Sequence, residues 1–211
     1  MNKIAIIGYG ELGRLYHHHL VSDKETKVIF FDDYLLKKGK KDHVFAFHEY
    51  GEKKFNTYHF FVSLGYHHLK KKVEIINLLL EENRLVPFFA HSTSFVHSSA
   101  FLGKGTFILP MCNIDKEVVI GKGVFIAGST CISHNNTIGD GCHIGAGVIT
   151  SGNVQIGKHT FIGTGTSITN NVKIGSNVKI GIGSVVTKDI PDGCSAIGNP
   201  ISILDNQIKL I

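Results

Sequence analysis

Aliphatic residues recur at every sixth position through the second half of the chain, from Val96 to Val186. Fifteen of the sixteen positions in this row are aliphatic, and the exception is Thr150. A second row, four residues after the first, holds small or β-branched side chains except at Asn136. A period of six fits neither an α-helix nor an alternating strand, but it fits short strands joined by tight turns around a three-sided prism. The pattern therefore predicts a parallel β-helix.

Three six-residue repeats make one coil of such a prism, so each side chain lies about 4.8 Å from the one eighteen residues later. Five coils fit between residues 96 and 186. Both rows are expected to point inward, where large and small side chains alternate to fill a narrow interior. Cys112 and Cys142 fall in the second row and are expected to be core residues. Glycine and asparagine at the corners suit a left-handed backbone.

The first part of the chain has a different pattern, in which apolar runs alternate with amphipathic segments. Strands are expected at residues 3–7, 27–33 and 56–65, with one helix after the first strand and another at residues 70–83. Strands that alternate with helices indicate a small parallel α/β unit. We therefore predict two domains, which are a half-Rossmann α/β domain at residues 1–90 and a β-helix with a C-terminal tail at residues 91–211.

A glycine-rich turn formed by Gly8, Gly10 and Gly13 follows the first predicted strand. Such glycines let backbone N–H groups approach a phosphate at a helix N-terminus. Asp32, nineteen residues after Gly13, lies where a ribose contact is expected. Since a dinucleotide needs two such halves, we expect a nucleotide that carries a smaller group, with Asp32 or Asp33 accepting hydrogen bonds from ribose or base. The alternative is that the glycines only form a tight turn and the aspartates cap a strand.

Composition narrows the class of protein. The chain is 43% hydrophobic, lacks an apolar run of roughly 20 residues, and does not begin like a signal peptide, which favours a cytoplasmic protein with no membrane contact. Its net charge of +5 is spread along the chain, so solvated surfaces are favoured over nucleic-acid binding.

No metal site is expected. The four cysteines are too widely spaced for a zinc site or a disulfide framework. Neighbouring side chains on a helix diverge by about 100°, so they cannot chelate one ion. This argument excludes the three consecutive histidines, His17, His18 and His19.

Several motifs together resemble one family. They are IIGYGELG, FFDD, VSLG, FFAHSTSFV at 88–96, SHNNTIGDGCHIGAG and GNP at 198–200. The chain resembles the sugar O- and N-acyltransferases, which acetylate a 4-amino group on a nucleotide-linked deoxysugar or a hydroxyl of sialic acid. They belong to the left-handed β-helix acyltransferases. The resemblance implies a left-handed helix, acetyl-coenzyme A as co-substrate, a nucleotide sugar held by the first domain, and a homotrimer with active sites in the grooves between neighbouring prisms.

The resemblance also implies residue roles. In the first domain it assigns the phosphate loop to Gly8, Gly10 and Gly13, and the nucleoside pocket to Asp32, Asp33 and Gly65. In the second domain it assigns the general base to His134, and contacts with coenzyme A to His143 and Gly183. For His143 the alternative is an aromatic stack with Phe125 and Phe161 that seals the trimer interface.

His134 lies two residues after the inward Ile132 and is therefore expected to point outward beside a corner of the prism. Lys116 lies one coil below it and Gly152 one coil above it. A glycine there would leave room for a thioester and expose a backbone N–H for the developing oxyanion. The alternative is an ordinary surface histidine.

Asn135 departs from the family pattern, in which many members have Glu or Asp after the histidine. An amide can orient the imidazole without adding charge, so the strength of the base and the choice between amine and hydroxyl acceptors are left open. Glu117 lies one coil below Asn135, and we hypothesise that it substitutes for the missing carboxylate. The alternative is a solvated corner residue.

Three functions are compatible with these observations. The first is N-acetylation of a nucleotide-linked amino sugar by direct attack on the thioester, with His134 as base and no acyl-enzyme. Cys142 points inward and Cys131 has no evident basic partner, so neither is expected to be a nucleophile. The second is O-acetylation of a sugar or sialic acid. The third is a non-catalytic trimeric scaffold with a nucleotide-sensing domain.

Overall fold

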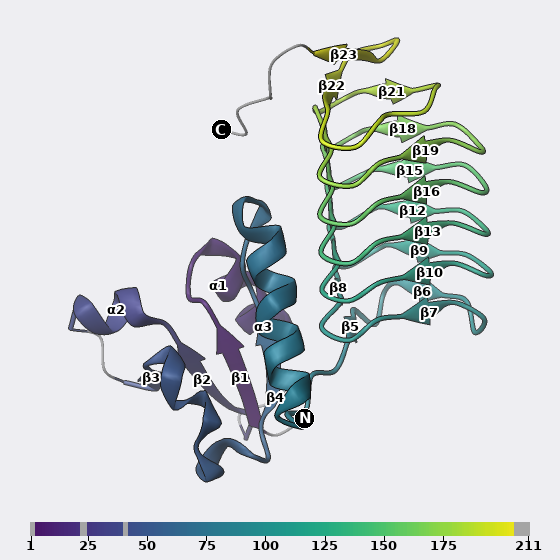
Figure 1. Cartoon of the computed structure of the whole chain (residues 1–211). Helices are drawn as coiled ribbons and strands as arrows, with labels where there is room; N and C mark the ends of the chain where they lie inside the picture. The colour runs from purple at the N-terminus through teal and green to yellow at the C-terminus, as the bar shows by residue number, and fades with distance from the viewer. Residues whose placement is uncertain (1–2, 22–24, 40–41, 205–211) are drawn as a thin grey trace. The chain divides into compact units, whose positions relative to one another are not determined.

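The computed structural model describes residues 3–21, 25–39 and 42–204. The chain forms two compact units, Met1–Pro87 and Phe88–Ile211, and both are visible in Figure 1. The second unit begins three residues before the expected boundary, because Phe89–Ala90 already pairs with Phe107–Ile108 of the β-helix. Each unit is described below by itself.

The first unit contains a parallel four-stranded sheet in the order β3-β2-β1-β4. Its elements in chain order are β1 (Lys3–Ile7), α1 (Glu11–Leu20), β2 (Lys27–Phe31), α2 (Asp33–Lys37), β3 (Val44–Phe45), the 3₁₀ turns η1 (Phe47–Gly51) and η2 (Lys53–Phe55), β4 (His59–Val62), the 3₁₀ turn η3 (Tyr66–His68) and α3 (Leu69–Glu81). Strand β1 in the middle of the sheet and strand β4 at its edge are both largely buried, as expected for a parallel sheet. The half-Rossmann prediction is confirmed.

Two of the expected strands are longer in the prediction than in the structure. Strand β2 ends at Phe31, because Asp32 adopts the position that precedes helix α2 and caps it with its side chain. Strand β4 ends at Val62, so Gly65 lies beyond the sheet and precedes η3. Asp32 and Gly65 therefore both lie just beyond a strand, at the carboxyl edge of the sheet.

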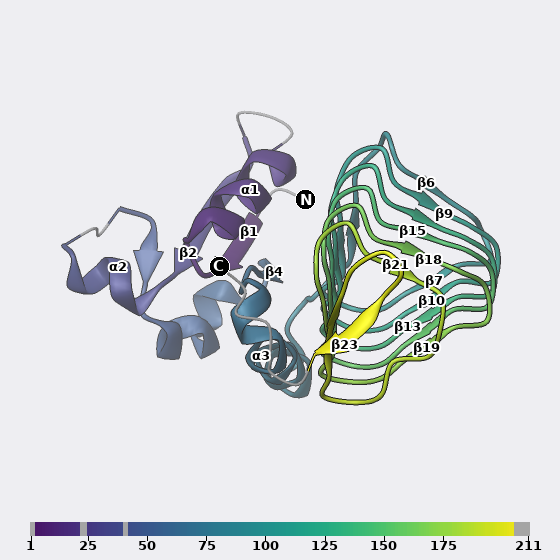
Figure 2. The same ribbon diagram turned by 90° about the horizontal axis from the view of Figure 1, so that it is seen from above.

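The second unit is a three-sided parallel β-helix, and each side is one sheet of strands two or three residues long. Seen along its axis, the stack of coils has a triangular outline (Figure 2). The β14 sheet consists of β5 (Phe89–Ala90), β8 (Phe107–Ile108), β11 (Phe125–Ile126), β14 (His143–Ile144), β17 (Phe161–Ile162), β20 (Lys179–Ile180), β22 (Ser195–Ile197) and the antiparallel β23 (Ser202–Leu204).

The β12 sheet consists of β6 (Phe95–Val96), β9 (Asn113–Ile114), β12 (Cys131–Ile132), β15 (Ile149–Thr150), β18 (Ser167–Ile168) and β21 (Val185–Val186). The β13 sheet consists of β7 (Phe101–Leu102), β10 (Val119–Ile120), β13 (Thr137–Ile138), β16 (Gln155–Ile156) and β19 (Lys173–Ile174). Paired residues in all three sheets are eighteen apart over the regular coils, for example Thr137 and Gln155. This spacing is the one that the six-residue period predicts.

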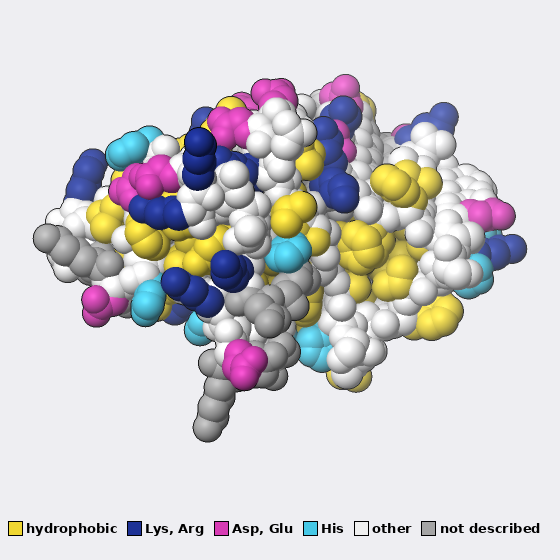
Figure 3. Space-filling model, turned by 90° about the horizontal axis from the view of Figure 1, so that it is seen from below, with side chains coloured by type: hydrophobic (Ala, Val, Ile, Leu, Met, Phe, Trp, Pro, Cys, Tyr) yellow, Lys and Arg dark blue, Asp and Glu magenta, His cyan; other side chains and the backbone are white. Residues whose placement is uncertain are grey.

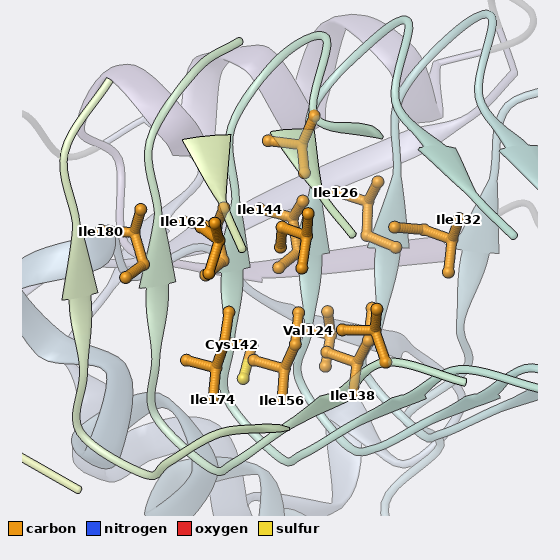
Figure 4. Close-up of a cluster of buried hydrophobic side chains, with 14 of the residues drawn as sticks. Val124, Ile126, Ile132, Ile138, Cys142, Ile144, Ile156, Ile162, Ile174 and Ile180 are labelled. Atoms are coloured by element: carbon orange, nitrogen blue, oxygen red, sulfur yellow. The ribbon is translucent and has the colours of Figure 1, made fainter. Parts of the chain in front are cut away.

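The interior of the β-helix is filled by the two predicted rows of side chains. Figure 4 shows isoleucines of successive coils pointing toward one another, with Val124 and Cys142 from the second row beside them. Cys142 and Ile144 are fully buried, and Cys112 is 2% exposed. Inward hydroxyls bind the carbonyls of the corners, as Thr130 Oγ1 does to Gly145 O at 3.0 Å, so the polar members of the second row are satisfied.

The first coil leaves apolar side chains on the surface at the end of the prism. Figure 3 shows hydrophobic side chains on this end of the β-helix. They line a hollow of about 410 Å³ formed by Phe88, Ala90, Val96, Ala100, Phe101 and Leu102.

Candidate functional site

His134 lies in the turn that joins β12 to β13, at one corner of the prism, and its side chain is half-buried. The ring rests on Gly152 of the next coil. A Cβ at Gly152 would lie 2.7 Å from His134 Nε2 and closer still to Cε1. The imidazole therefore occupies the space that a side chain at residue 152 would fill, which accounts for the glycine. Room for a thioester beside the ring stays a prediction.

A chain of two hydrogen bonds holds the other side of the imidazole. His134 Nδ1 lies 2.8 Å from Asn135 Oδ1, and Asn135 Nδ2 donates to Glu117 Oε2 at 2.5 Å. Glu117 therefore meets Asn135 and not the histidine itself. Nε2 of His134 takes no part in these two hydrogen bonds.

Asn136 is the residue of this turn whose role the sequence pattern does not reveal. Its side chain is 1% exposed, and Nδ2 donates to the carbonyls of Ser133 and Ser151, while Oδ1 accepts from Val154 N at 3.0 Å. The buried amide thus ties the His134 turn to the coil that carries Gly152. The signal was present as the single exception in the second inward row.

The aromatic neighbours of His143 are those expected. Its ring stacks on Phe161 at 5.4 Å between centroids and on Phe125 at 4.8 Å. His143 belongs to the β14 sheet, whereas His134 lies at the corner between the other two sheets. Within one chain, His134 and His143 therefore do not meet.

Gly183 lies in the turn between β20 and β21, at the corner of the β14 and β12 sheets. It has a φ of +66°, and a Cβ there would meet nothing within 4 Å. The backbone requires a left-handed residue at this corner, and the absence of a side chain leaves its outer surface open. Gly183 is thus apart from Gly152, which shares the corner of His134.

In the first unit, two of the predicted loop glycines have structural reasons to be glycine. Gly8 has a φ of +95°, which disfavours other residues. A Cβ at Gly13 would lie 3.0 Å from Gly8 C and closer still to Gly8 O, so the third glycine lets α1 pack against the loop.

At Gly10 and Gly65, neither the backbone conformation nor a close contact requires glycine. They precede α1 and η3, the first structures after β1 and β4, which are neighbours in the sheet. Their φ values are −66° and −74°, and a Cβ at either would meet nothing within 4 Å. The roles of Gly10 in a phosphate loop and of Gly65 in a nucleoside pocket stay predictions.

Asp32 holds the glycine loop in shape, whereas Asp33 holds the start of η1. Asp32 Oδ2 accepts from Tyr9 N at 2.8 Å and Oδ1 from Leu35 N at 3.0 Å, so one carboxylate both fastens the glycine loop and caps α2. Asp33 Oδ1 accepts from Phe47 N at 2.9 Å. Their contact with a nucleoside stays a prediction.

We expect Gly10→Ala to weaken nucleotide binding at least tenfold without a change in thermal stability, because the methyl group enters only the open space. Gly13→Ala is the matched comparison, and we expect it to lower the melting temperature as well. Isothermal titration with a nucleoside diphosphate and a thermal melt measure both effects. Unchanged affinity in Gly10→Ala would remove the phosphate site from this loop.

The cysteines are free thiols in two environments. Burial raises the pKa of Cys142 to about 12 and the pKa of Cys112 above its ordinary value. Cys131 and Cys194 are half-buried, and Asn113 Nδ2 approaches Cys131 Sγ at 3.8 Å.

We expect iodoacetamide at pH 7.5 to leave Cys112 and Cys142 unmodified in the native protein and to modify all four cysteines after denaturation, because alkylation requires an accessible thiolate. Peptide mass spectrometry after each treatment measures this. Modification of Cys142 in native protein would contradict its place in the core and reopen the question of a cysteine nucleophile.

The remaining residues considered for metal binding do not gather into a site. His18 and His19 are in edge-to-face contact at 5.2 Å, while His17 faces Phe30 at 5.7 Å. Across residues 3–21, 25–39 and 42–204, no group of three or more histidine, cysteine or acidic side chains is placed to hold a metal ion. In the same described ranges, no helix has the length and apolar character to cross a membrane.

Residues 153–188 match the model of the family described as bacterial transferase hexapeptide (six repeats). Residues 153–188 are therefore hexapeptide repeats, and they lie within the six-residue period that runs from Val96 to Val186. No curated protein matches the chain.

Three solved structures share the fold of this chain over nearly its whole length. The acetyltransferase domain of PglB from Neisseria gonorrhoeae is 24% identical, with a TM-score of 0.84 over 97% of this chain and 100% of that chain. PerB from Caulobacter crescentus, solved with CoA and GDP-perosamine, is 23% identical, with a TM-score of 0.86 over 97% and 98%. WeeI from Acinetobacter baumannii is 19% identical, with a TM-score of 0.64 over 96% and 99%.

These likenesses confirm the predicted fold, which is a half-Rossmann unit followed by a left-handed β-helix of hexapeptide repeats. The hexapeptide-repeat domain places His134, Asn135, Glu117 and Gly152 together at one corner. It places His143 and Gly183 elsewhere on the prism.

Proposed function

We propose that the chain is an N-acetyltransferase that moves the acetyl group of acetyl-CoA to the amino group of a nucleotide-linked amino-deoxysugar. The observation that carries the proposal is His134, an outward imidazole seated on Gly152 with Nδ1 held by Asn135 and Nε2 directed away from that contact. A neutral imidazole is the side chain best suited to accept a proton near pH 7. A scaffold has no need of this arrangement.

The sugar amine must lose a proton before or during its attack on the thioester carbon. His134 Nε2 takes that proton as the nitrogen–carbon bond forms, and the Gly152 N–H is the expected donor to the developing oxyanion. The carbon–sulfur bond then breaks, the coenzyme A thiolate leaves, and the proton on His134 is available to it. The products are an amide and the free thiol, and no acyl-enzyme forms.

The first unit supplies the proposed nucleotide-sugar site. The open glycines Gly10 and Gly65 lie at the carboxyl edge of neighbouring parallel strands, where ligands of α/β sheets bind. PerB, which shares the fold, was solved with CoA and GDP-perosamine. We therefore assign the nucleotide of the acceptor to this edge.

A complete site is proposed to require a second copy of the chain. His143 and Gly183, which the resemblance associates with coenzyme A, are on other parts of the prism than His134. The faces of the prism also expose large apolar side chains, among them Phe101 at 62% and Ile149 at 52%. A trimer would bring His143 of one copy toward His134 of another and cover these faces. Light scattering of the purified protein gives the copy number.

A panel assay tests the proposed reaction. The protein is mixed with acetyl-CoA and with amino or hydroxy sugars, free or linked to a nucleotide, while thiol release is followed. Release with nucleotide-linked amino sugars alone supports the proposal. Release with hydroxyl acceptors would favour O-acetylation, an outcome that Asn135 keeps open because it replaces a carboxylate beside the base. No release with any acceptor would favour the scaffold.

A thermal-shift comparison of UDP, GDP, dTDP and CMP identifies the nucleotide. A ligand that binds only the native state stabilises it by about 2.7 kcal/mol at one hundred times its Kd. We expect UDP, GDP or dTDP to give the largest shift. A preference for CMP would point to a sialic acid as the acceptor.

A further inference from the structure

We propose that Glu117 and Asn135 are positioning residues that fix His134 in the tautomer with the proton on Nδ1, so that Nε2 is free to act as the base. The inference rests on the proposed function for its chemical meaning, but its geometry stands on hydrogen bonds within one corner of the prism. It also changes the expected role of Glu117, because the carboxylate acts through an amide and not on the imidazole directly.

Which atom donates in each of the two hydrogen bonds follows from the protons that each group carries. An ionised carboxylate only accepts hydrogen bonds, so Glu117 Oε2 must receive a proton from the nitrogen of the Asn135 amide. The amide is thereby held with its oxygen toward the ring, 2.8 Å from His134 Nδ1. That oxygen only accepts, so Nδ1 must donate, and the lone pair of the neutral imidazole lies on Nε2.

Without the carboxylate the direction would not be fixed. An asparagine amide can turn by 180° and present its nitrogen to Nδ1, which would then accept, and the proton would move to Nε2. A ring protonated at Nε2 cannot take the proton of the incoming amine. The other ring nitrogen therefore decides whether His134 can serve as a base.

The backbone holds the two partners in register on adjacent coils. Glu117 and Asn135 have φ values of +57° and +59°, and Asn135 N donates to Lys116 O at 3.0 Å. Glu117 N donates to Ser99 Oγ at 2.9 Å, which anchors the lower coil in turn. Asparagine adopts the left-handed region readily, whereas glutamate is disfavoured there, so local backbone preference does not account for Glu117.

In the turns of the two coils on either side of His134, the other charged side chains belong to the same turn as Glu117. They are Asp115, whose Oδ1 accepts from Lys116 N at 2.7 Å, and the exposed Lys116. The coil above His134 contributes Ser151, Gly152 and Asn153, which carry no charge. Among these turn residues, the negative group that contacts the Asn135 amide is Glu117.

Exchanging the amide of Asn135 and the carboxylate of Glu117 tests the proposed pair of hydrogen bonds directly. Asn135→Asp alone sets two carboxylates against each other, and we expect kcat to fall at least 30-fold with little change in KM. Glu117→Gln alone leaves the amide free to turn, and we expect a smaller fall of about 3- to 10-fold. The double variant restores a donor at 117 and an acceptor at 135, so it is expected to recover kcat to within about threefold of the original protein. Double-variant activity no better than Asn135→Asp would overturn the proposal.

A spectroscopic readout separates the positioning role from activity. In protein labelled with ¹⁵N in histidine, the ring nitrogens of His134 are assigned from the signals lost in His134→Asn. We expect the Nδ1–H pattern at a pH where the ring is neutral, and a shift toward the Nε2–H pattern in Glu117→Gln. The Nε2–H pattern in the unaltered protein would overturn the proposal even if the enzyme is active.

The matched control is Asn171→Asp, which makes the same change at the same corner two coils away, with a φ of +63°. It is expected to leave both kcat and the His134 signals unchanged. Thermal melts of all variants establish that they are folded. If no acetyl transfer occurs but the Nδ1–H pattern is present and sensitive to Glu117, the proposed function fails while the hydrogen-bond chain stands.

Discussion

Replacing His134 by asparagine is expected to lower kcat/KM for acetyl transfer by about 10³-fold. General base catalysis by a positioned side chain contributes about 10² to 10⁴-fold, and the low end applies only where solvent can replace the base. Asparagine keeps a polar group at the corner but cannot accept the proton. The loss is expected in kcat, because the proposed nucleotide site is in the first unit and does not include the imidazole.

The matched control for this variant is His91→Asn, at another outward position of the β-helix. His91 Nδ1 pairs with Thr93 within its own turn, a contact that an asparagine oxygen can reproduce. This control is expected to have unchanged kcat and KM. A His134→Asn protein that turns over within threefold of the original rate would refute the assignment of the base.

The sequence alone is enough to predict the β-helix down to the direction of individual side chains, because a six-residue period leaves few geometric choices. Val124, Cys142 and Ile144 are buried as the two rows predict, and His143 stacks between Phe125 and Phe161. The residues at which helices and strands begin and end are harder to predict from the sequence. An aspartate after an apolar run suits both a strand end and a helix N-cap, and Asp32 proved to be the cap of α2.

The sequence predicts which residues of the candidate site are neighbours, but it does not predict the hydrogen bonds between them. Register alone sets His134 beside Gly152 and Asn135 beside Glu117, whereas the hydrogen bonds depend on rotamers that a spacing does not encode. The imidazole packs against Gly152, where a larger residue would displace the ring. Similarly, the odd Asn136 of the inward row is explained only when its amide is seen to bind Ser133 O and Ser151 O.

Gly152→Ala is expected to lower kcat by about 100-fold while the melting temperature changes by less than about 2 °C. The added methyl group would lie 2.7 Å from His134 Nε2, so the ring must swing away from the corner. The ring is the end of a mobile side chain and can move into solvent, so the folded state loses little stability. A displacement of about 1 Å at a reacting group is enough to cost roughly 10²-fold in rate.

Two comparisons separate this effect from a general disturbance of the coil. Asn170→Ala changes the same turn position one coil further on and is expected to retain full activity. In a His134→Ala background the Gly152→Ala change meets no ring, so it is expected to cause no further loss of rate. Full activity in Gly152→Ala would show that the seat of the imidazole is irrelevant to catalysis, because the methyl group and the ring cannot occupy the same space. The Gly152→Ala variant thus tests whether the position of the His134 ring matters, and the His134→Asn variant tests whether the ring acts as the base.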